Sequence, residues 1–212
     1  MKSFTLLPRE EQYAPALAID RVTLGPMASH SYLNDAKHLG FTLARYKFVA
    51  KMLGGKPLVA EIGAGDGFGA QVVKQAVTKL DLFAFDPMWD EWTQTWDIVD
   101  ARLPISFYDG IYMVDVLEHI KPKDETRAME NVCASLTEDG VFIAGMPSIE
   151  SQVYASLSSR KGHVNCKSGE VLRRDMLKYF RNVFLFGMND EMLHVGFTPM
   201  CHYLFVLCVG VR

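Results

Sequence analysis

The chain has 212 residues, of which 49% belong to the hydrophobic set AVILMFWYC and 22% are charged. This length suits one domain, and the composition is that of a globular chain rather than a disordered or collagen-like one. The 22 Lys and Arg against 25 Asp and Glu give a formal net charge of −3. Because no positive excess is present to neutralise a phosphate backbone, we expect no nucleic-acid partner.

From the given sequence we expect neither export nor membrane insertion. The first residues, MKSFTLLPREEQ, contain no apolar run that leads to a small-residue cleavage site. The longest apolar run, in YLFVLCVGV, has the length of a buried strand and is too short to cross a bilayer as a helix. The four cysteines form no C-x-x-C pair, so we interpret them as free thiols in a reducing cytoplasm.

Strand and helix patterns alternate along most of the chain. Residues 1–32 mix proline, charge and scattered apolar residues and predict a lead-in or lid, before a domain that spans 33–212. Strands are predicted at 58–62, 82–85, 93–98, 110–114, 141–144, 182–186 and 201–209, and helices at 33–53, 69–79, 124–136 and 168–180. This alternation predicts an α/β fold with a mostly parallel sheet and helices on both faces, whose ligand binds beyond the carboxyl ends of the strands.

The loop after the first strand carries the most specific signal. It has an acidic-x-G-x-G-x-G pattern formed by Glu61, Gly63, Gly65 and Gly67. Glycine lacks the Cβ that would hold a ligand away from the backbone, and the following helix points its N-terminus at the same space. A dinucleotide-binding G-x-G-x-x-G fits only from Gly65, with Ala70 as its sixth residue. An NAD(P)-dependent oxidoreductase therefore stays an alternative, whereas the Gly-Lys-Ser/Thr of a P-loop is absent.

Acidic residues follow the next two strands. Asp86, with Pro87 after it, closes the second strand, where a carboxylate can accept hydrogen bonds from both hydroxyls of an adenosine ribose. Such a residue serves NAD and S-adenosylmethionine equally. Asp97 is placed to accept a hydrogen bond from an adenine amino group, with Asp100 as the alternative. All three tryptophans also lie in this segment, and one of them could stack on the adenine.

The fourth strand ends in a run of ionisable residues, Asp115-Val-Leu-Glu118-His119. His119 is the first candidate for a general base because imidazole titrates near neutral pH. His163, in a G-H-x-N run among polar and aromatic loops at about 147–200, is the second candidate. A structural role for each histidine is the alternative. No metal site is expected, because no pair among His119, His163 and His194 has the H-x-x-x-H spacing of a helix-borne site.

Together, Glu61-Ile-Gly-Ala-Gly-Asp-Gly, Asp86 and the run from Tyr108 to His119 resemble the class I S-adenosylmethionine-dependent methyltransferases. The likeness is closest to the small-molecule branch with the ubiquinone and menaquinone methylases, and it covers roughly residues 40–147. It implies a Rossmann-like sheet of seven strands with the last antiparallel, and S-adenosyl-L-methionine as cofactor. The cofactor-binding residues that it implies are Glu61, Gly63, Gly65, Gly67, Asp86, Pro87, Asp97 and Asp115.

The same resemblance narrows the reaction. The run DVLEH is not the Asn/Asp-Pro-Pro-aromatic signature of enzymes that methylate DNA bases. We expect a small-molecule acceptor, a metabolite or sugar-type compound, methylated at oxygen with His119 or His163 as the base. A protein that binds the cofactor without catalysis is a further alternative, and the oligomeric state is left open.

Overall fold

The computed structural model describes residues 9–20, 22–104 and 107–212, so the first part of the expected lead-in lies outside the described residues. Four short 3₁₀-helices are described: η1 (Pro87–Trp89), η2 (Leu117–His119), η3 (Glu150–Tyr154) and η4 (Thr198–Met200). The α-helices are α1 (Arg9–Leu17), α2 (Pro26–Asn34), α3 (Ala36–Met52), α4 (Ala70–Lys74), α5 (Pro122–Ser135), α6 (Leu157–Gly162) and α7 (Gly169–Met176). The strands are β1 (Leu58–Ile62), β2 (Lys79–Ala84), β3 (Gln94–Thr95), β4 (Tyr108–Val114), β5 (Leu136–Pro147), β6 (Phe180–Asn189), β7 (Met192–His194) and β8 (Tyr203–Val211).

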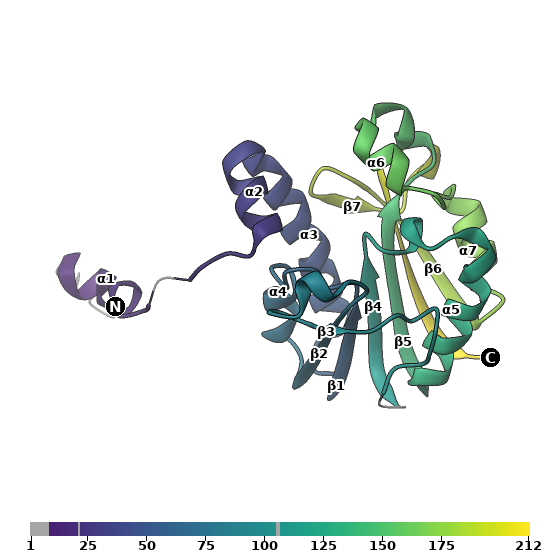
Figure 1. The fold of residues 1–212 in the computed structure, drawn as a ribbon, viewed down its shortest axis with the longest axis horizontal. Helices are drawn as coiled ribbons and strands as arrows, with labels where there is room; N and C mark the ends of the chain where they lie inside the picture. The colour runs from purple at the N-terminus through teal and green to yellow at the C-terminus, as the bar shows by residue number, and fades with distance from the viewer. Residues whose placement is uncertain (1–8, 21, 105–106) are drawn as a thin grey trace, which may run out of the picture.

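These strands form one sheet in the order β3-β2-β1-β4-β5-β8-β6-β7 (Figure 1). Strands β1 to β5 pair in parallel, and β8 runs antiparallel to both β5 and β6. The chain builds outward from β1 through β2 to β3 and then returns to place β4 on the other side of β1. The strand order therefore reverses between β1 and β4, which is the point where open α/β sheets bind their ligands.

The sheet differs from the expected seven strands by one short edge strand. The chain turns at Asp190, which has a φ of 49°, and β7 then pairs antiparallel with the end of β6. The sequence analysis treated this polar segment as a loop, because three residues are too few to show an alternating pattern. The antiparallel last strand was expected, and β8 confirms it.

Two apolar layers hold the helices against the sheet. Successive β4 residues point to opposite faces: Tyr112 packs on the side of α3 and α4, while Ile111 and Met113 pack on the side of α5 and α7. Figure 1 shows these helices on opposite sides of the sheet. Because both faces are covered, the central strands are apolar without alternation, as the sequence showed.

Several predicted bounds were wrong for local reasons. Helix α4 is shorter than 69–79, because Ala76, Thr78 and Lys79 form backbone hydrogen bonds with residues 55–57. Strand β3 ends early, since the Asp97 carboxylate accepts a hydrogen bond from the Val99 backbone at 2.8 Å. Strand β5 begins at Leu136 rather than at residue 141, with a register irregularity opposite β4 between Tyr108 and Gly110.

The described part of the lead-in contains α1 and most of α2, with irregular backbone at 22–25. Helix α2 has no side-chain cap of its own, but Asp66 of the glycine loop accepts a hydrogen bond from the Ala28 backbone at 3.0 Å. This contact ties α2 to the loop after β1. Among the described residues, none of the helices is long and apolar enough to cross a membrane, and all four cysteines are free thiols.

Candidate functional site

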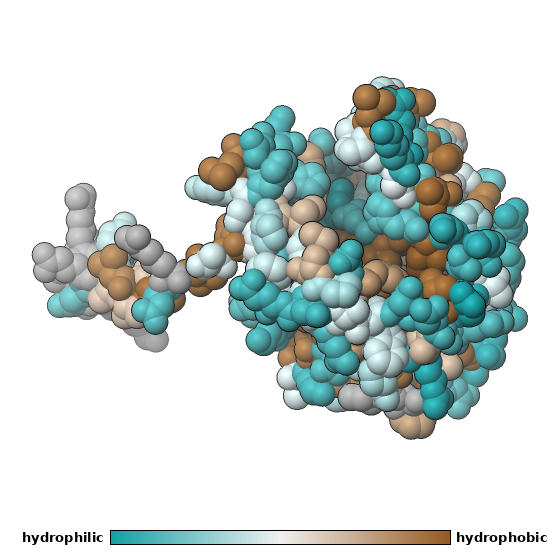
Figure 2. Space-filling model, in the orientation of Figure 1, coloured by the Kyte–Doolittle hydropathy of each residue, from teal (hydrophilic) through white to brown (hydrophobic). Residues whose placement is uncertain are grey.

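A cleft of about 630 Å³ opens at the carboxyl ends of β1, β2 and β4. Figure 2 shows this face of the molecule hollowed between the α2–α3 corner and the region of α6. The lining residues come from every strand end that the sequence analysis singled out. They are Met27, Gly63, Gly65, Ala84, Phe85, Asp86, Trp89, Asp97, Val99, Asp115, Val116, His119, Ile120, Lys121 and Asp124.

The glycine loop has a backbone that other residues adopt only with strain. The φ angles of Gly63, Gly65 and Gly67 are +83°, +56° and +71°, all in the left-handed region. A Cβ on Gly63 would stand 2.2 Å from a methyl group of Val116, so a larger residue cannot fit there. A Cβ on Gly65 would meet no atom within 4 Å, because that position faces the open cleft. Gly65 thus exposes bare backbone to a ligand.

Glu61 lies beneath this loop and does not line the cleft. Its carboxylate is fully buried and accepts hydrogen bonds from the Tyr46 hydroxyl at 2.5 Å and the Tyr112 hydroxyl at 2.6 Å. Burial raises the pKa of Glu61 to about 7, although the two hydrogen bonds lower it in part. This acidic residue therefore joins α3, β1 and β4 below the glycines.

Two carboxylates stand on the wall of the cleft formed by β2 and β3. Asp86 accepts a hydrogen bond from the Met88 backbone at 2.9 Å and so caps η1, with Trp89 close by in the cleft wall. Asp97 also lines the cleft, whereas Asp100 does not. Pro87 begins η1, and neither it nor Gly67 belongs to the lining.

Asp115 directly follows β4, has a φ of 58° and lines the same cleft as Asp86. Its carboxylate forms an ion pair with Arg45 of α3 at 2.7 Å, and the Arg45 guanidinium lies 3.9 Å from the centre of the Tyr203 ring. Burial, the largest single cause, lowers the pKa of Arg45, but Asp115, Tyr203 and Glu118 together leave the pKa raised. The ion pair fixes the direction of the Asp115 side chain.

His119 and His163 come together although they are far apart in the sequence. Their ring centres are 5.2 Å apart in an edge-to-face arrangement. His119 Nδ1 lies 2.9 Å from the Gly162 carbonyl oxygen, and His163 Nδ1 lies 2.9 Å from the Gln152 side-chain oxygen. Burial and the neighbouring His119 lower the pKa of His163. Both sequence-predicted histidines thus border one corner of the site, and His119 lines the cleft itself.

Glu118 lies between the histidines and is fully buried. Burial, and then the charge of Asp115, raise its pKa well above the usual range of a carboxyl group. Neither of its carboxyl oxygens has a hydrogen-bond partner among the described residues.

The loop that carries His163 is held by a buried polar network. Asn165 donates a hydrogen bond to Glu125 of α5 at 2.7 Å, and Lys167 forms ion pairs with Glu125 at 2.9 Å and with Asp175 at 3.1 Å. The backbone amides of Val164 and Asn165 donate to the Glu118 carbonyl. The asparagine of the G-H-x-N run therefore anchors this loop to α5. This anchoring determines the position of the neighbouring His163.

Sequence reasoning missed Met27, Arg45 and the role of Asp66. Arg45 could have been noticed from its helical spacing. In a helix over 33–53 it lies one turn from Val49, which is buried, so Arg45 belongs to the buried face. A buried cation needs an anionic partner. Met27 lines the cleft from the lead-in, where no periodic pattern marked it. His194, also considered for a metal site, instead lies beside Cys201 with 3.8 Å between Nε2 and Sγ.

No protein-family model and no curated protein matches the chain. Solved structures do match its fold. A methyltransferase dependent on S-adenosylmethionine from Thermotoga maritima, a possible histamine N-methyltransferase, aligns with 86% of this chain and 94% of its own at 16% identity, with a TM-score of 0.65. Another from Archaeoglobus fulgidus aligns with 86% of this chain and 98% of its own at 12% identity, with a TM-score of 0.67.

The N-methyltransferase NodS of Bradyrhizobium japonicum, solved with S-adenosyl-L-homocysteine, aligns with 94% of this chain and 97% of its own at 15% identity, with a TM-score of 0.55. At such identities the likeness concerns the fold alone. The chain has the fold of the S-adenosylmethionine-dependent methyltransferases.

Proposed function

We propose that the protein is a methyltransferase that uses S-adenosyl-L-methionine. The observation that carries this proposal is the bare backbone of Gly65, which faces a cleft whose other wall carries Asp86 and Asp97. The cleft lies at the reversal of strand order, and solved proteins of the same fold are methyltransferases. This combination is what an adenosine with a methionine-like tail requires of its site.

The glycines, carboxylates and tryptophan of the cleft wall, and Glu61 beneath the loop, then have proposed roles. Gly63 and Gly65 let the amino-acid end of the cofactor approach the backbone, Asp86 accepts hydrogen bonds from the ribose, and Asp97 rather than Asp100 receives the adenine amino group. Trp89 offers an aromatic surface for the adenine. Asp115, oriented by Arg45, lies where the methionine end and the acceptor meet. Glu61 acts from below by holding the loop on Tyr46 and Tyr112.

When bound, S-adenosyl-L-methionine would supply an electrophilic methyl group, since its sulfonium sulfur would keep the electron pair of the carbon–sulfur bond on transfer to the acceptor. The protein's task is therefore to position the acceptor and to assist the loss of its proton. His119 first, and His163 second, are the residues that we propose for this assistance, because they stand together beside the cleft. Two imidazoles at this corner favour a hydroxyl acceptor, and the resemblance to the ubiquinone and menaquinone methylase branch favours a small molecule as the acceptor.

Thermal unfolding with a panel of adenosine-containing ligands tests the cofactor. We expect S-adenosyl-L-homocysteine to raise the midpoint of unfolding, since a ligand that binds only the folded state stabilises it. NAD(P)H should leave the midpoint unchanged. Stabilisation by NAD(P)H but not by S-adenosyl-L-homocysteine would replace the proposal with an oxidoreductase. Tight binding of S-adenosyl-L-homocysteine, without methyl transfer to a broad set of hydroxyl compounds, would favour a non-catalytic binding protein.

Replacement of Asp86 is expected to weaken cofactor binding. Asp86→Ala removes charge-assisted hydrogen bonds, which are worth about 1.5–3 kcal/mol, or roughly a 10- to 150-fold rise in the dissociation constant of S-adenosyl-L-homocysteine. Because Asp86 also caps η1, Asp86→Asn is the matched variant, since it keeps an oxygen for the cap and loses the charge. Calorimetric titration measures both variants. A loss of only a few tenths of a kcal/mol in each would mean that the carboxylate faces solvent.

A further inference from the structure

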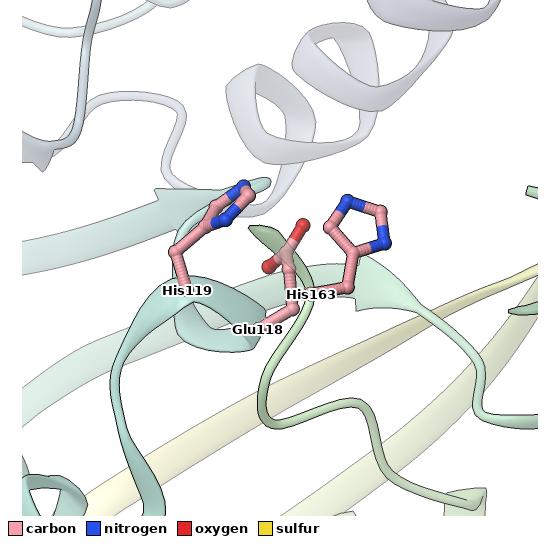
Figure 3. Close-up of side chains that lie close together, drawn as sticks. All are labelled: Glu118, His119 and His163. Atoms are coloured by element: carbon pink, nitrogen blue, oxygen red, sulfur yellow. The ribbon is translucent and has the colours of Figure 1, made fainter. Parts of the chain in front are cut away.

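Glu118, His119 and His163 form a cluster that the proposed function uses only in part. Each of the three residues offers one ligand atom within 4.8 Å of those of the other two, and no other such group of His, Cys, Asp or Glu occurs in the part of the chain that the structure describes. Figure 3 shows the Glu118 carboxylate between the two imidazole rings, with two of the residues on η2 and the third on the loop after α6.

Glu118 is the group in this cluster that lacks an explanation. A buried carboxyl group normally has hydrogen-bond partners, because burying one without them costs several kcal/mol. Both oxygens of Glu118 are buried and have no hydrogen-bond partner among the described residues, whereas the equally buried Glu61 accepts hydrogen bonds from two tyrosines. The nearby cation Arg45 is paired with Asp115 instead. The part of the chain that the structure describes therefore supplies no paired cation to the Glu118 carboxyl group.

The histidines are arranged as metal-binding histidines usually are. A ligating imidazole binds the ion through one nitrogen and donates the other N–H to an oxygen. Nδ1 of His119 faces the Gly162 carbonyl, which can only accept, so this nitrogen carries the proton. Nδ1 of His163 faces the oxygen of Gln152 in the same way. In both rings the lone pair of Nε2 is left free for a ligand.

We propose that Glu118, His119 and His163 bind a divalent metal ion. Two imidazoles and one carboxylate on one side of an ion, with the remaining positions open, are typical of Fe²⁺ and similar octahedral first-row ions. Mn²⁺ is the suitable probe, because it prefers oxygen and nitrogen ligands and avoids the thiol of Cys201 beside His194. Ligand atoms within 4.8 Å of one another can reach one ion at distances of about 2.0–2.2 Å, as for zinc, with at most small side-chain movements.

The inference rests on the proposed function for its chemical consequence. An acceptor hydroxyl bound at an open position beside the cleft would have its pKa lowered and would release its proton to water, which leaves an oxygen lone pair for the methyl group. The histidines then assist proton loss through the ion rather than as bases. The open positions select acceptors whose oxygens can reach the ion, such as sugar-type compounds with adjacent hydroxyls.

The experiment is a titration of the purified, chelator-treated protein with Mn²⁺, followed by the loss of the free-ion signal in electron paramagnetic resonance. We expect one Mn²⁺ per chain in the wild-type protein and at least a tenfold loss of affinity in His163→Ala, in His119→Ala and in Glu118→Gln. The two histidines are not fully buried, so their variants should fold even if Glu118→Gln does not, and circular dichroism checks each variant. His194→Ala is the control and should bind like the wild type.

Absence of stoichiometric Mn²⁺ binding, or binding that survives both histidine substitutions, would overturn the metal site. The titration is made without cofactor, and calorimetry with S-adenosyl-L-homocysteine is run on the same samples. Cofactor binding without Mn²⁺ binding would contradict the metal site and leave the proposed methyltransferase unaffected. Mn²⁺ binding without cofactor binding would support the metal site and contradict the proposed methyltransferase reaction.

Discussion

Gly65→Val is expected to lose affinity for S-adenosyl-L-homocysteine by roughly a hundredfold or more, which corresponds to about 3 kcal/mol. The Gly65 position faces the cleft, and a Cβ there meets no protein atom within 4 Å. The valine side chain would therefore occupy the space proposed for the ligand without displacing the core. The measurement is calorimetric titration, with thermal unfolding to show that the variant is folded.

The left-handed backbone at Gly65 means that valine also adds strain, and a matched variant separates this effect from obstruction. Gly55 has a φ of +78° and likewise no atom within 4 Å of a Cβ, but it lies in the turn before β1, outside the cleft lining. Gly55→Val should cost similar stability, about 1–2 kcal/mol, and leave the dissociation constant unchanged. Equal affinities of the two variants would remove Gly65 from the ligand path.

Glu61→Gln is expected to change how stability depends on pH. The folded-state pKa of Glu61 is about 7, against an ordinary value of 4.5. Because folding raises the pKa, the contribution of Glu61 to the free energy of unfolding is fully present below pH 4.5. It is lost as the pH rises through 7. Above that pH the ionised carboxylate costs on the order of 3 kcal/mol. The free energy of unfolding of the wild type should therefore fall, relative to the variant, between about pH 4.5 and 7.

Glutamine is a close match for the protonated acid, since its oxygen can accept from one tyrosine and its NH₂ can donate to the hydroxyl of the other. Tyr46 and Tyr112 both keep their protons, because burial and then the charge of Glu61 raise their pKa values well above 10. Urea unfolding at a series of pH values measures the effect. Parallel stability curves for the two proteins would show that Glu61 does not titrate near neutral pH.

Prediction from the sequence worked best for two kinds of residue. The first are glycines that a left-handed backbone requires, and the second are aspartates that directly follow a strand. All three glycines of the loop have positive φ, and Asp86, Asp97 and Asp115 lie around one cleft. The prediction of Glu61 as a cofactor contact shows the limit of such patterns. Its position in the motif is visible, but the two tyrosines that turn it into a buried support come from other elements.

The cluster of Glu118, His119 and His163 was harder to foresee, because its parts are distant in the chain. The absence of an H-x-x-x-H pair argued against a metal site, yet that rule concerns ligands on one helix. Here η2 supplies Glu118 and His119, and an anchored loop supplies His163. Only the packing of that loop against α5 brings the third side chain into place, and no local pattern encodes it. The short edge strand β7 escaped prediction for a similar reason, since pairing with β6 defines it.

A crystal structure of the protein with S-adenosyl-L-homocysteine is the most direct test of the proposed methyltransferase. We expect the amino-acid end of the ligand against the backbone of Gly63 and Gly65, the ribose hydroxyls on Asp86, and the adenine beside Asp97. A ligand bound elsewhere on the molecule, or a cleft filled by protein side chains in that crystal, would contradict it.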